Sequence, residues 1–193
     1  MIPGFTNLKD SVQVFTDGSN SLKSGFCGWS TIVRYQRLEV RRCGWAKGTN
    51  SFSELYAIVY ALRRMPWNLP VVIYSDSQYA IRVLTDYRDK WVRNGFRNAK
   101  GEPVAYKELI QEGHKLLDGL PKLTLVHVPG HAGFEGNEAA DKLAKAARFV
   151  GEGKLRKDDP TSILPYGCVW SWEYLRMQDG LDSDTGMVYR RSV

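Results

Sequence analysis

The sequence predicts an α/β fold in which helices pack on a mixed five-stranded sheet, with three antiparallel strands followed by two parallel ones. Three observations predict it. Three β-rich segments follow one another between residues 12 and 45. Two further short apolar runs, 71–74 and 123–128, each stand between segments of helical periodicity, and that periodicity ends after Gly151. The order β-β-β-α-β-α-α-β-α is typical of helices packed on one sheet.

The first three strands are predicted to form an antiparallel meander. Residues 12–16 alternate apolar and β-branched side chains, and a polar loop is expected at 17–25. Strands at 26–35 and 38–45 are separated by so short a link that they should form a hairpin.

Helical spacing follows the hairpin. Apolar residues recur at every third or fourth position over 52–62, with Ser51 or Ser53 as candidate caps. Pro66 and Pro70 are expected to end this helix.

The fourth strand, 71–74, is a continuous apolar run of the kind that is buried on both faces. The connection from the first strand through the helix to this strand should be a right-handed crossover, which makes the two strands parallel neighbours. Further helices are expected after Asp76, at 104–117 and at 136–149, with the fifth strand at 123–128 between the last two.

Composition and charge narrow the class of protein. The 193 residues suffice for one domain with an appendage, and the apolar share of 43% is that of a soluble globular protein. The net charge of +6 favours a polyanionic partner. No secretory signal is visible, and no apolar run is long enough to cross a membrane.

Cysteine usage indicates the compartment. Cys27, Cys43 and Cys168 show neither Cys-x-x-Cys nor Cys/His spacing, so reduced thiols are expected and structural zinc is not. We therefore expect an intracellular protein, cytoplasmic or nuclear.

The chain is expected to divide into a domain at 1–150 and a C-terminal extension at 151–193. Proline and glycine punctuate the extension, yet it is too aromatic for a simple disordered tail. Within 166–177 it carries Tyr166, Trp170, Trp172 and Tyr174. We expect residues 170–175 to dock as a short helix on the core of the protein or on a partner, with 166–177 as the candidate surface for a protein partner or for self-association.

Four acids are expected to meet at one rim of the sheet. Asp17 and Asp76 follow the first and fourth strands, whose carboxyl ends lie together if the strands are parallel. Glu54 lies in the first turns of the helix that starts beside that edge, and Asp141 lies on the last helix. Taken singly, each acid reads as a turn residue, a cap or a solvated position. Together they would repel one another unless protons or divalent cations neutralise them, and all-oxygen ligands favour Mg²⁺ or Mn²⁺.

Five motifs occur in a fixed order: Thr16-Asp17-Gly18-Ser19, Ser53-Glu54-Leu55, Tyr74-Ser75-Asp76-Ser77-Gln78, Val128-Pro129-Gly130-His131-Ala132-Gly133 and Gly136-Asn137-Glu138-Ala139-Ala140-Asp141. Together they resemble the signature of type 1 ribonucleases H, which cut the RNA strand of RNA–DNA hybrids. The likeness covers residues 12–148 and implies the ribonuclease H-like fold.

The resemblance implies a two-Mg²⁺ site, with Mn²⁺ as a possible substitute, whose ligands are Asp17, Glu54, Asp76 and Asp141. Gly18 would let the backbone come close to metal or substrate. His131 would lie on a loop and assist proton movement or product release; the alternative is an ordinary exposed loop histidine. By the same resemblance, hydrolysis leaves 5′-phosphate and 3′-hydroxyl ends.

Residues 88–107 are basic and aromatic, and they resemble the basic protrusion that grips the DNA strand in this family. Cationic side chains attract phosphates independently of base sequence. Trp91 and Phe96 have two open roles, stacking on sugars or anchoring the protrusion. The substrate contacts implied by the resemblance are Lys47, Thr49, Asn50, Ser77, Gln78, Trp91, Arg93, Phe96, Arg97 and Lys100.

Some positions depart from the family pattern. Ser51 and Phe52 stand where an amide and an arginine are usual, and Tyr106 stands where an asparagine often lines a phosphate pocket. These departures bear on hybrid affinity and leave the four acids untouched.

Three functions remain open at this point: a hybrid-specific endoribonuclease, a catalytically silent hybrid-binding module, and the ribonuclease H segment of a retroelement polyprotein. The presence of all four acids favours the enzyme. The basic protrusion and the initial Met1 favour a free-standing protein.

Overall fold

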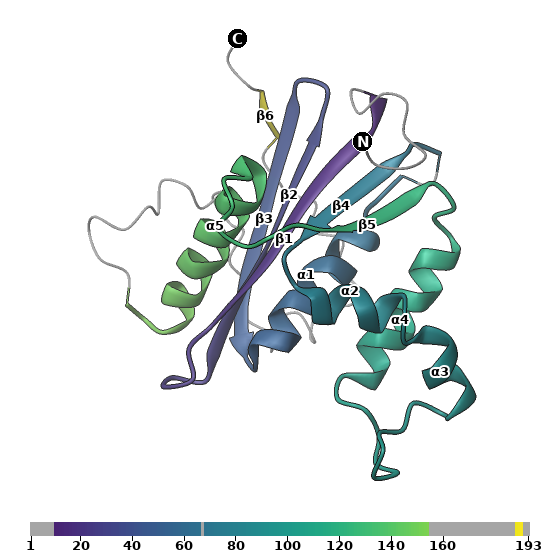
Figure 1. The fold of residues 1–193 in the computed structure, drawn as a ribbon. Coiled ribbons are helices and arrows are strands. Elements are labelled where there is room, and N and C mark those ends of the chain that lie inside the picture. Colours follow the sequence, from purple (N-terminus) through teal and green to yellow (C-terminus); the bar gives the residue numbers. More distant parts are fainter. Residues whose placement is uncertain (1–9, 67, 155–187, 191–193) are drawn as a thin grey trace, which may run out of the picture.

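The computed structural model describes residues 10–66, 68–154 and 188–190 (Figure 1). The strands are β1 (Val12–Asn20), β2 (Phe26–Tyr35), β3 (Leu38–Lys47), β4 (Val71–Ser75), β5 (Leu123–His127) and β6 (Val188–Arg190). The helices are α1 (Asn50–Leu62), α2 (Gln78–Leu84), α3 (Arg88–Arg93), α4 (Lys107–Asp118) and α5 (Glu135–Gly151).

The strands form one mixed sheet in the order β5-β4-β1-β2-β3-β6. β1, β2 and β3 are antiparallel neighbours, whereas β4 pairs parallel with β1 and β5 parallel with β4. The predicted α/β class, meander and parallel pair are therefore confirmed. The sheet has one strand more than the five predicted, because Val188–Arg190 adds a sixth strand antiparallel to β3.

β1 is longer than predicted, and this changes the setting of its acid. Residues 17–20 were expected in a loop, but they continue β1 because each pairs with β2, from Asp17↔Ser30 to Asn20↔Cys27. The prediction of a loop from residue 17 is therefore wrong for residues 17–20. The parallel ladder with β4 stops earlier, at Thr16↔Ser75, so Asp17 stands where its neighbour β4 ends.

α1 begins one residue after Thr49, whose side chain accepts a hydrogen bond from the Phe52 N–H. The predicted caps, Ser51 and Ser53, are therefore wrong; the Ser53 hydroxyl lies inside the helix and donates to the Asn50 carbonyl at 2.9 Å. Thr49 has the extended backbone and side-chain oxygen that an N-cap requires.

α3 was not predicted as a helix, because its six residues are all at least partly exposed and leave no apolar stripe. α4 starts at Lys107, three residues later than predicted, because the preceding Tyr106 adopts a left-handed backbone with φ of 58°.

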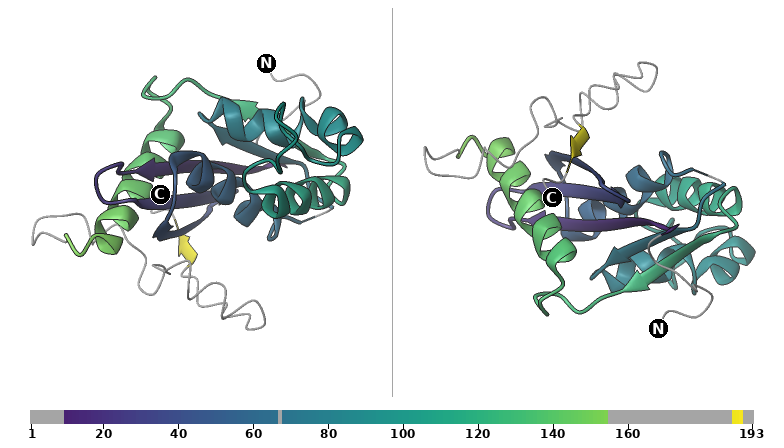
Figure 2. Two further views of the ribbon diagram at one scale, coloured as in Figure 1. Left: turned by 90° about the horizontal axis from the view of Figure 1, so that it is seen from below. Right: turned by 90° about the horizontal axis from the view of Figure 1, so that it is seen from above.

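The helices cover the two faces of the sheet unequally. α5 packs on β1, β2 and β3 from one side, whereas α1 packs on β1 and β2 from the other and contacts α2 and α4. Figures 1 and 2 show α5 on one side of the molecule and the α1–α4 group on the opposite side.

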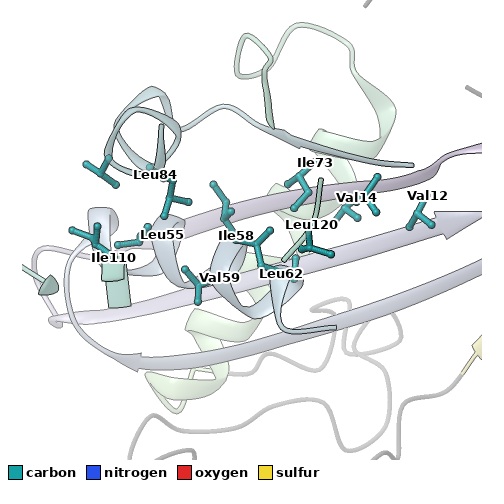
Figure 3. Close-up of a cluster of buried hydrophobic side chains, with 14 of the residues drawn as sticks. Val12, Val14, Leu55, Ile58, Val59, Leu62, Ile73, Leu84, Ile110 and Leu120 are labelled. Carbon is teal, nitrogen blue, oxygen red and sulfur yellow. The ribbon is translucent and has the colours of Figure 1, made fainter. Parts of the chain in front are cut away.

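The main hydrophobic core lies under α1. Val12 and Val14 of β1 and Ile73 of β4 meet Leu55 and Ile58 of α1 there (Figure 3). A smaller cluster lies under α5 and contains Phe15, Ile32, Cys43, Ala140, Leu143 and Ala147. These two clusters fix α1 and α5 on opposite faces of the strand that carries Asp17.

Cys27 and Cys43 are both buried, and neither forms a disulfide within the described residues. Among the described residues, no helix combines the length and apolar character needed to span a membrane. The segment 166–177, for which docking was predicted, lies outside the described residues.

Candidate active site

Three of the four predicted acids converge. Ligand-type oxygens of Asp17, Glu54 and Asp76 all lie within 4.8 Å of one another. Asp17 and Asp76 meet because they directly follow the last parallel pair, Thr16↔Ser75, so both stand at the same rim. The sequence-based placement of these two acids is thus reproduced by the register of β1 and β4.

Glu54 reaches this rim because Gly18 has no side chain. Successive residues of a strand point to opposite faces. Phe15 packs in the cluster under α5, so Asp17 belongs to that face and Gly18 to the face of α1. A Cβ atom built on Gly18 would stand 2.6 Å from the Glu54 backbone nitrogen and 3.0 Å from its carboxyl carbon. The crowding around Gly18 therefore comes from α1, and the Glu54 carboxyl passes directly over it.

Burial and the closeness of the carboxylates disfavour ionisation of the acids in this group. Asp17 is only 3% exposed and Glu54 only 6%. Burial, and then the neighbouring carboxylates, raise the pKa of Asp17 to about 9. Burial, and then Asp76, raise the pKa of Glu54 to about 8. Both carboxyls would therefore hold protons at neutral pH unless another positive charge replaced them.

The donor set fits a hard divalent cation. Glu54 Oε2 and Asp76 Oδ1 are buried and have no hydrogen-bond partner among the described residues. Buried polar atoms are nearly always satisfied, so such an orphaned pair needs an explanation. Oxygen donors grouped this closely suit Mg²⁺ or Mn²⁺, which prefer carboxylates and water.

Asp141 stands beside this group without joining it. It lies on α5, and its Oδ2 accepts a hydrogen bond from Lys145 Nζ at 2.7 Å. Its charge nevertheless contributes to the raised pKa of Asp17 and of Glu54. α5 is held at this position by the Ser30 hydroxyl, which donates to the Ala140 carbonyl at 2.7 Å.

The loop between β5 and α5 passes next to Asp76. The Val128 N–H donates to the Ser75 carbonyl at 3.0 Å, and a Cβ built on Gly130 would stand 2.9 Å from Asp76 Oδ2. His131 follows, exposed and with a left-handed φ of 54°. The loop is held at its far end because Glu138 Oε1 accepts from the Gly133 N–H at 3.1 Å. The predicted histidine thus lies one residue from a glycine that touches the acidic group.

The start of α1 brings together Thr49 and Asn50, two of the predicted substrate contacts. Asn50 Nδ2 donates to Glu54 Oε1 at 3.3 Å, which orients that carboxylate. The Thr49 hydroxyl shares a hydrogen bond of 2.7 Å with the Tyr106 hydroxyl. Lys47 is exposed at the end of β3, with its ammonium 5.9 Å from the centre of the Phe26 ring.

The departures at Phe52 and Tyr106 form one contact. Their ring centres lie 5.4 Å apart, so the first turn of α1 contacts the residue that caps α4. At the nearby start of α2, Ser77 is the N-cap and accepts from the Ala80 N–H at 3.2 Å, while Gln78 is exposed.

The basic segment 88–107 combines an anchored base with exposed cations. Phe96 is only 8% exposed and packs against the His114 ring at 5.8 Å, and Trp91 packs against the main core. This burial assigns Phe96 to anchoring. Arg93 and Lys100 are exposed, whereas Arg97 donates to the Gly101 carbonyl inside a small hairpin bridged from Arg97 to Pro103.

Two relationships in the site were not predicted. Asn50 was predicted to contact the substrate, and no role was predicted for Lys145. Each of them forms a hydrogen bond with an acid four residues away, Asn50 with Glu54 and Lys145 with Asp141. The i,i+4 spacing on a helix is the signal that would have identified both.

Comparison with known proteins agrees with this geometry. A family model described as RNase H matches residues 9–149. The ribonuclease H of Geotalea uraniireducens is 37% identical over 145 residues, which span 74% of this chain and 97% of that protein. The ribonuclease H of Rhizobium johnstonii is 38% identical over 135 residues, 69% of this chain and 89% of that one.

Solved structures show the same fold. LC9-RNase H1, a type 1 ribonuclease H with the type 2 active-site motif, is 26% identical with a TM-score of 0.61, covering 77% of this chain and 75% of that chain. The foamy viral protease-reverse transcriptase, solved in complex with dsDNA, is 26% identical with a TM-score of 0.63, covering 72% and 94%. The matched family model spans the sheet core, the acidic group and nearly all of α5, and the chain therefore belongs to the ribonuclease H family.

Proposed function

We propose that this protein hydrolyses the RNA strand of RNA–DNA hybrids with the help of two divalent cations, leaving 5′-phosphate and 3′-hydroxyl ends. One observation carries the proposal. Three buried or half-buried carboxylates meet at the rim of the sheet, and two of their oxygens, Glu54 Oε2 and Asp76 Oδ1, lack a partner among the described residues. A ribonuclease H solved in the same fold is consistent with it.

Asp17, Glu54, Asp76 and Asp141 would hold the two Mg²⁺ ions, with Mn²⁺ as a substitute, and Gly18 leaves room beside them. When bound, such ions lower the pKa of a water molecule and stabilise negative charge on the leaving oxygen. Burial, and then the neighbouring carboxylates, raise the pKa of Asp17 and of Glu54, and bound cations would supply the positive charge that lets both carboxyls release their protons.

The remaining site residues position these groups and move protons. Asn50 holds the Glu54 carboxylate through its amide, and the Val128 N–H binds the Ser75 carbonyl next to Asp76. The His131 imidazole, exposed on the adjoining loop, would carry a proton between the site and solvent.

Substrate contacts are proposed on both sides of the acidic group. Lys47, Thr49 and Asn50 at the start of α1, with Ser77 and Gln78 at the start of α2, would contact the hybrid where 2′-hydroxyls identify the RNA strand. Arg93, Arg97 and Lys100 would attract phosphates of the DNA strand, with Trp91 and Phe96 holding the segment that carries them.

The test is cleavage of a labelled RNA–DNA hybrid in Mg²⁺ by the wild type and by Asp76→Asn. We expect the substitution to lower the rate by at least ~100-fold, the scale of losing one electrostatic stabilising group, while hybrid binding persists. Asp86→Asn, which neutralises an exposed carboxylate at the end of α2, is the matched control and should cut normally. If the wild type and Asp76→Asn both bind the hybrid and neither cuts it, the protein is a binding module.

A further inference from the structure

Asp141 differs from the other three acids in one respect. Its Oδ2 lies 2.7 Å from the Lys145 ammonium, whereas no ion pair within the described part of the chain involves Asp17, Glu54 or Asp76. The Asp141 side chain is 17% exposed and the Lys145 side chain 46%, so this pair sits at the solvent side of the site. Asp141 therefore has a positively charged partner, Lys145, whereas the other three acids have none among the described residues.

The pair is built into α5. An acid four residues before a lysine is the favourable order for an ion pair on a helix. The next turn holds the helix in place, because Gly28 of β2 has no side chain and lets Ala144 and Arg148 pack directly on the strand. The helix backbone that carries Asp141 and Lys145 is therefore packed closely against the sheet.

A cation arriving at Asp141 must share or displace this ammonium. The other three carboxylates form a group within 4.8 Å and leave oxygens unpartnered, so a first divalent ion meets no such competitor. An ion that needs Asp141 meets Lys145 at hydrogen-bond distance. The two positions therefore differ in affinity for a reason that lies in the chain itself.

We propose that Lys145 is a positioning residue that serves as the internal counter-ion of Asp141 and weakens binding of the second divalent cation. This inference rests on the proposed function. The group formed by Asp17, Glu54 and Asp76 has no internal counter-ion among the described residues, so Lys145 lowers the affinity only of the cation that uses Asp141.

The chain offers a matched control. Lys142 lies on the same helix and is exposed, it makes no ion pair among the residues described, and its loss changes the net charge by the same amount. Methionine is the substitution of choice at both positions, because it keeps the unbranched length of lysine and favours helix formation. Lys145→Arg retains the positive charge beside Asp141.

The experiment is titration of the protein with Mn²⁺ in the absence of nucleic acid, with bound ions counted by electron paramagnetic resonance. Lys145→Met should bind the second ion about two- to fivefold more tightly than the wild type, the upper part of the range over which one partly exposed ion pair shifts an equilibrium. Its first-ion affinity should stay within about twofold of the wild-type value. Lys142→Met and Lys145→Arg should behave as the wild type at both positions.

Two results would overturn the role of Lys145: equal shifts in Lys145→Met and Lys142→Met, or no shift in either. If the wild type binds a single ion, Lys145→Met must reveal a second, and its failure to do so also rejects the inference. The proposed function is judged separately, because absence of hybrid cleavage alongside the predicted shift in Mn²⁺ affinity would reject cleavage and leave the counter-ion role standing.

Discussion

The Glu54 carboxyl lies over the position that a side chain at Gly18 would occupy. A Cβ on Gly18 would stand 3.0 Å from Glu54 Cδ and 2.6 Å from both the Glu54 nitrogen and Ser53 Oγ. The Glu54 nitrogen belongs to the backbone of a packed helix and cannot move away cheaply. The glycine of the Asp-Gly pair therefore decides whether a residue on α1 can reach an acid that faces α5.

Gly18→Ala tests this relationship. Overpacking against α1 should destabilise the protein by about 1–3 kcal/mol and push Glu54 away from Asp17 and Asp76. We expect the affinity for Mn²⁺ and the rate of hybrid cleavage to fall together, measured by titration and by a gel assay. Gly119→Ala adds the same methyl group 3.5 Å from the Leu116 carbonyl, with no closer neighbour, and should change neither. Unchanged Mn²⁺ affinity in Gly18→Ala would show that Glu54 reaches the site by another route.

Stability should depend on pH in a direction set by the buried acids. The folded pKa values of Asp17 and Glu54 are about 9 and about 8, against ordinary values of 3.8 and 4.5. Because folding raises these pKa values, their contribution is fully present below about pH 4 and is lost as pH rises through the folded values. In EDTA, the urea midpoint of the wild type should therefore fall between pH 5 and pH 9.

Asp17→Asn/Glu54→Gln removes both titrating groups and should flatten this pH dependence, raising the urea midpoint above that of the wild type at pH 8.5. Saturating Mg²⁺ should restore most of the lost stability to the wild type and little to the variant. A wild-type midpoint that rises with pH over this window would mean that the two carboxyls are ionised and well compensated in the folded protein.

The basic segment 88–107 should contribute to hybrid binding through charge. Arg93 and Lys100 are exposed, and their removal should raise KM for the hybrid with little change in kcat. Each lost phosphate contact should also lower the slope of log affinity against log salt by about 0.7–0.9. The measurement is binding of a fluorescent hybrid to Arg93→Ala/Lys100→Ala between 50 and 200 mM salt, a range over which such contacts weaken strongly.

Arg64→Ala/Lys122→Ala provides the control for net charge. Arg64 follows α1, and Lys122 precedes β5 at the end of the sheet opposite the acidic group. This double variant should keep the wild-type salt slope. If both double variants show the same slope of log affinity against log salt, the net charge of the protein, and not the basic segment, attracts the hybrid.

Some features of the site could be read from residue order alone. Asp17 and Asp76 were placed together because a right-handed crossover makes their strands parallel neighbours, and the register Thr16↔Ser75 bears this out. Buried apolar runs and helical spacing likewise located β4 and α1 within a few residues. These are local patterns, so a single sequence expresses them.

Other features depended on contacts between distant segments. β1 continues past Asp17 because β2 pairs with it as far as Asn20, and no local signal in Asp17-Gly18-Ser19 distinguishes this from a turn. Thr49, and not Ser51 or Ser53, caps α1, because the chain leaves β3 two residues before the helix begins. The sequence left two roles open for Phe96, stacking on a ligand and filling the core. Its packing against the His114 ring supports the second role.

Residue order alone identified four candidate acids and predicted the parallel strands that bring Asp17 and Asp76 together. The approach of Glu54 over Gly18, and the pairing of Asp141 with Lys145 outside the close group, became apparent only in the folded chain. The physical reason is that strand pairing and helical spacing are periodic along the chain. The space above one glycine, by contrast, and the distance between carboxylates on opposite faces of a sheet, depend on how the layers pack.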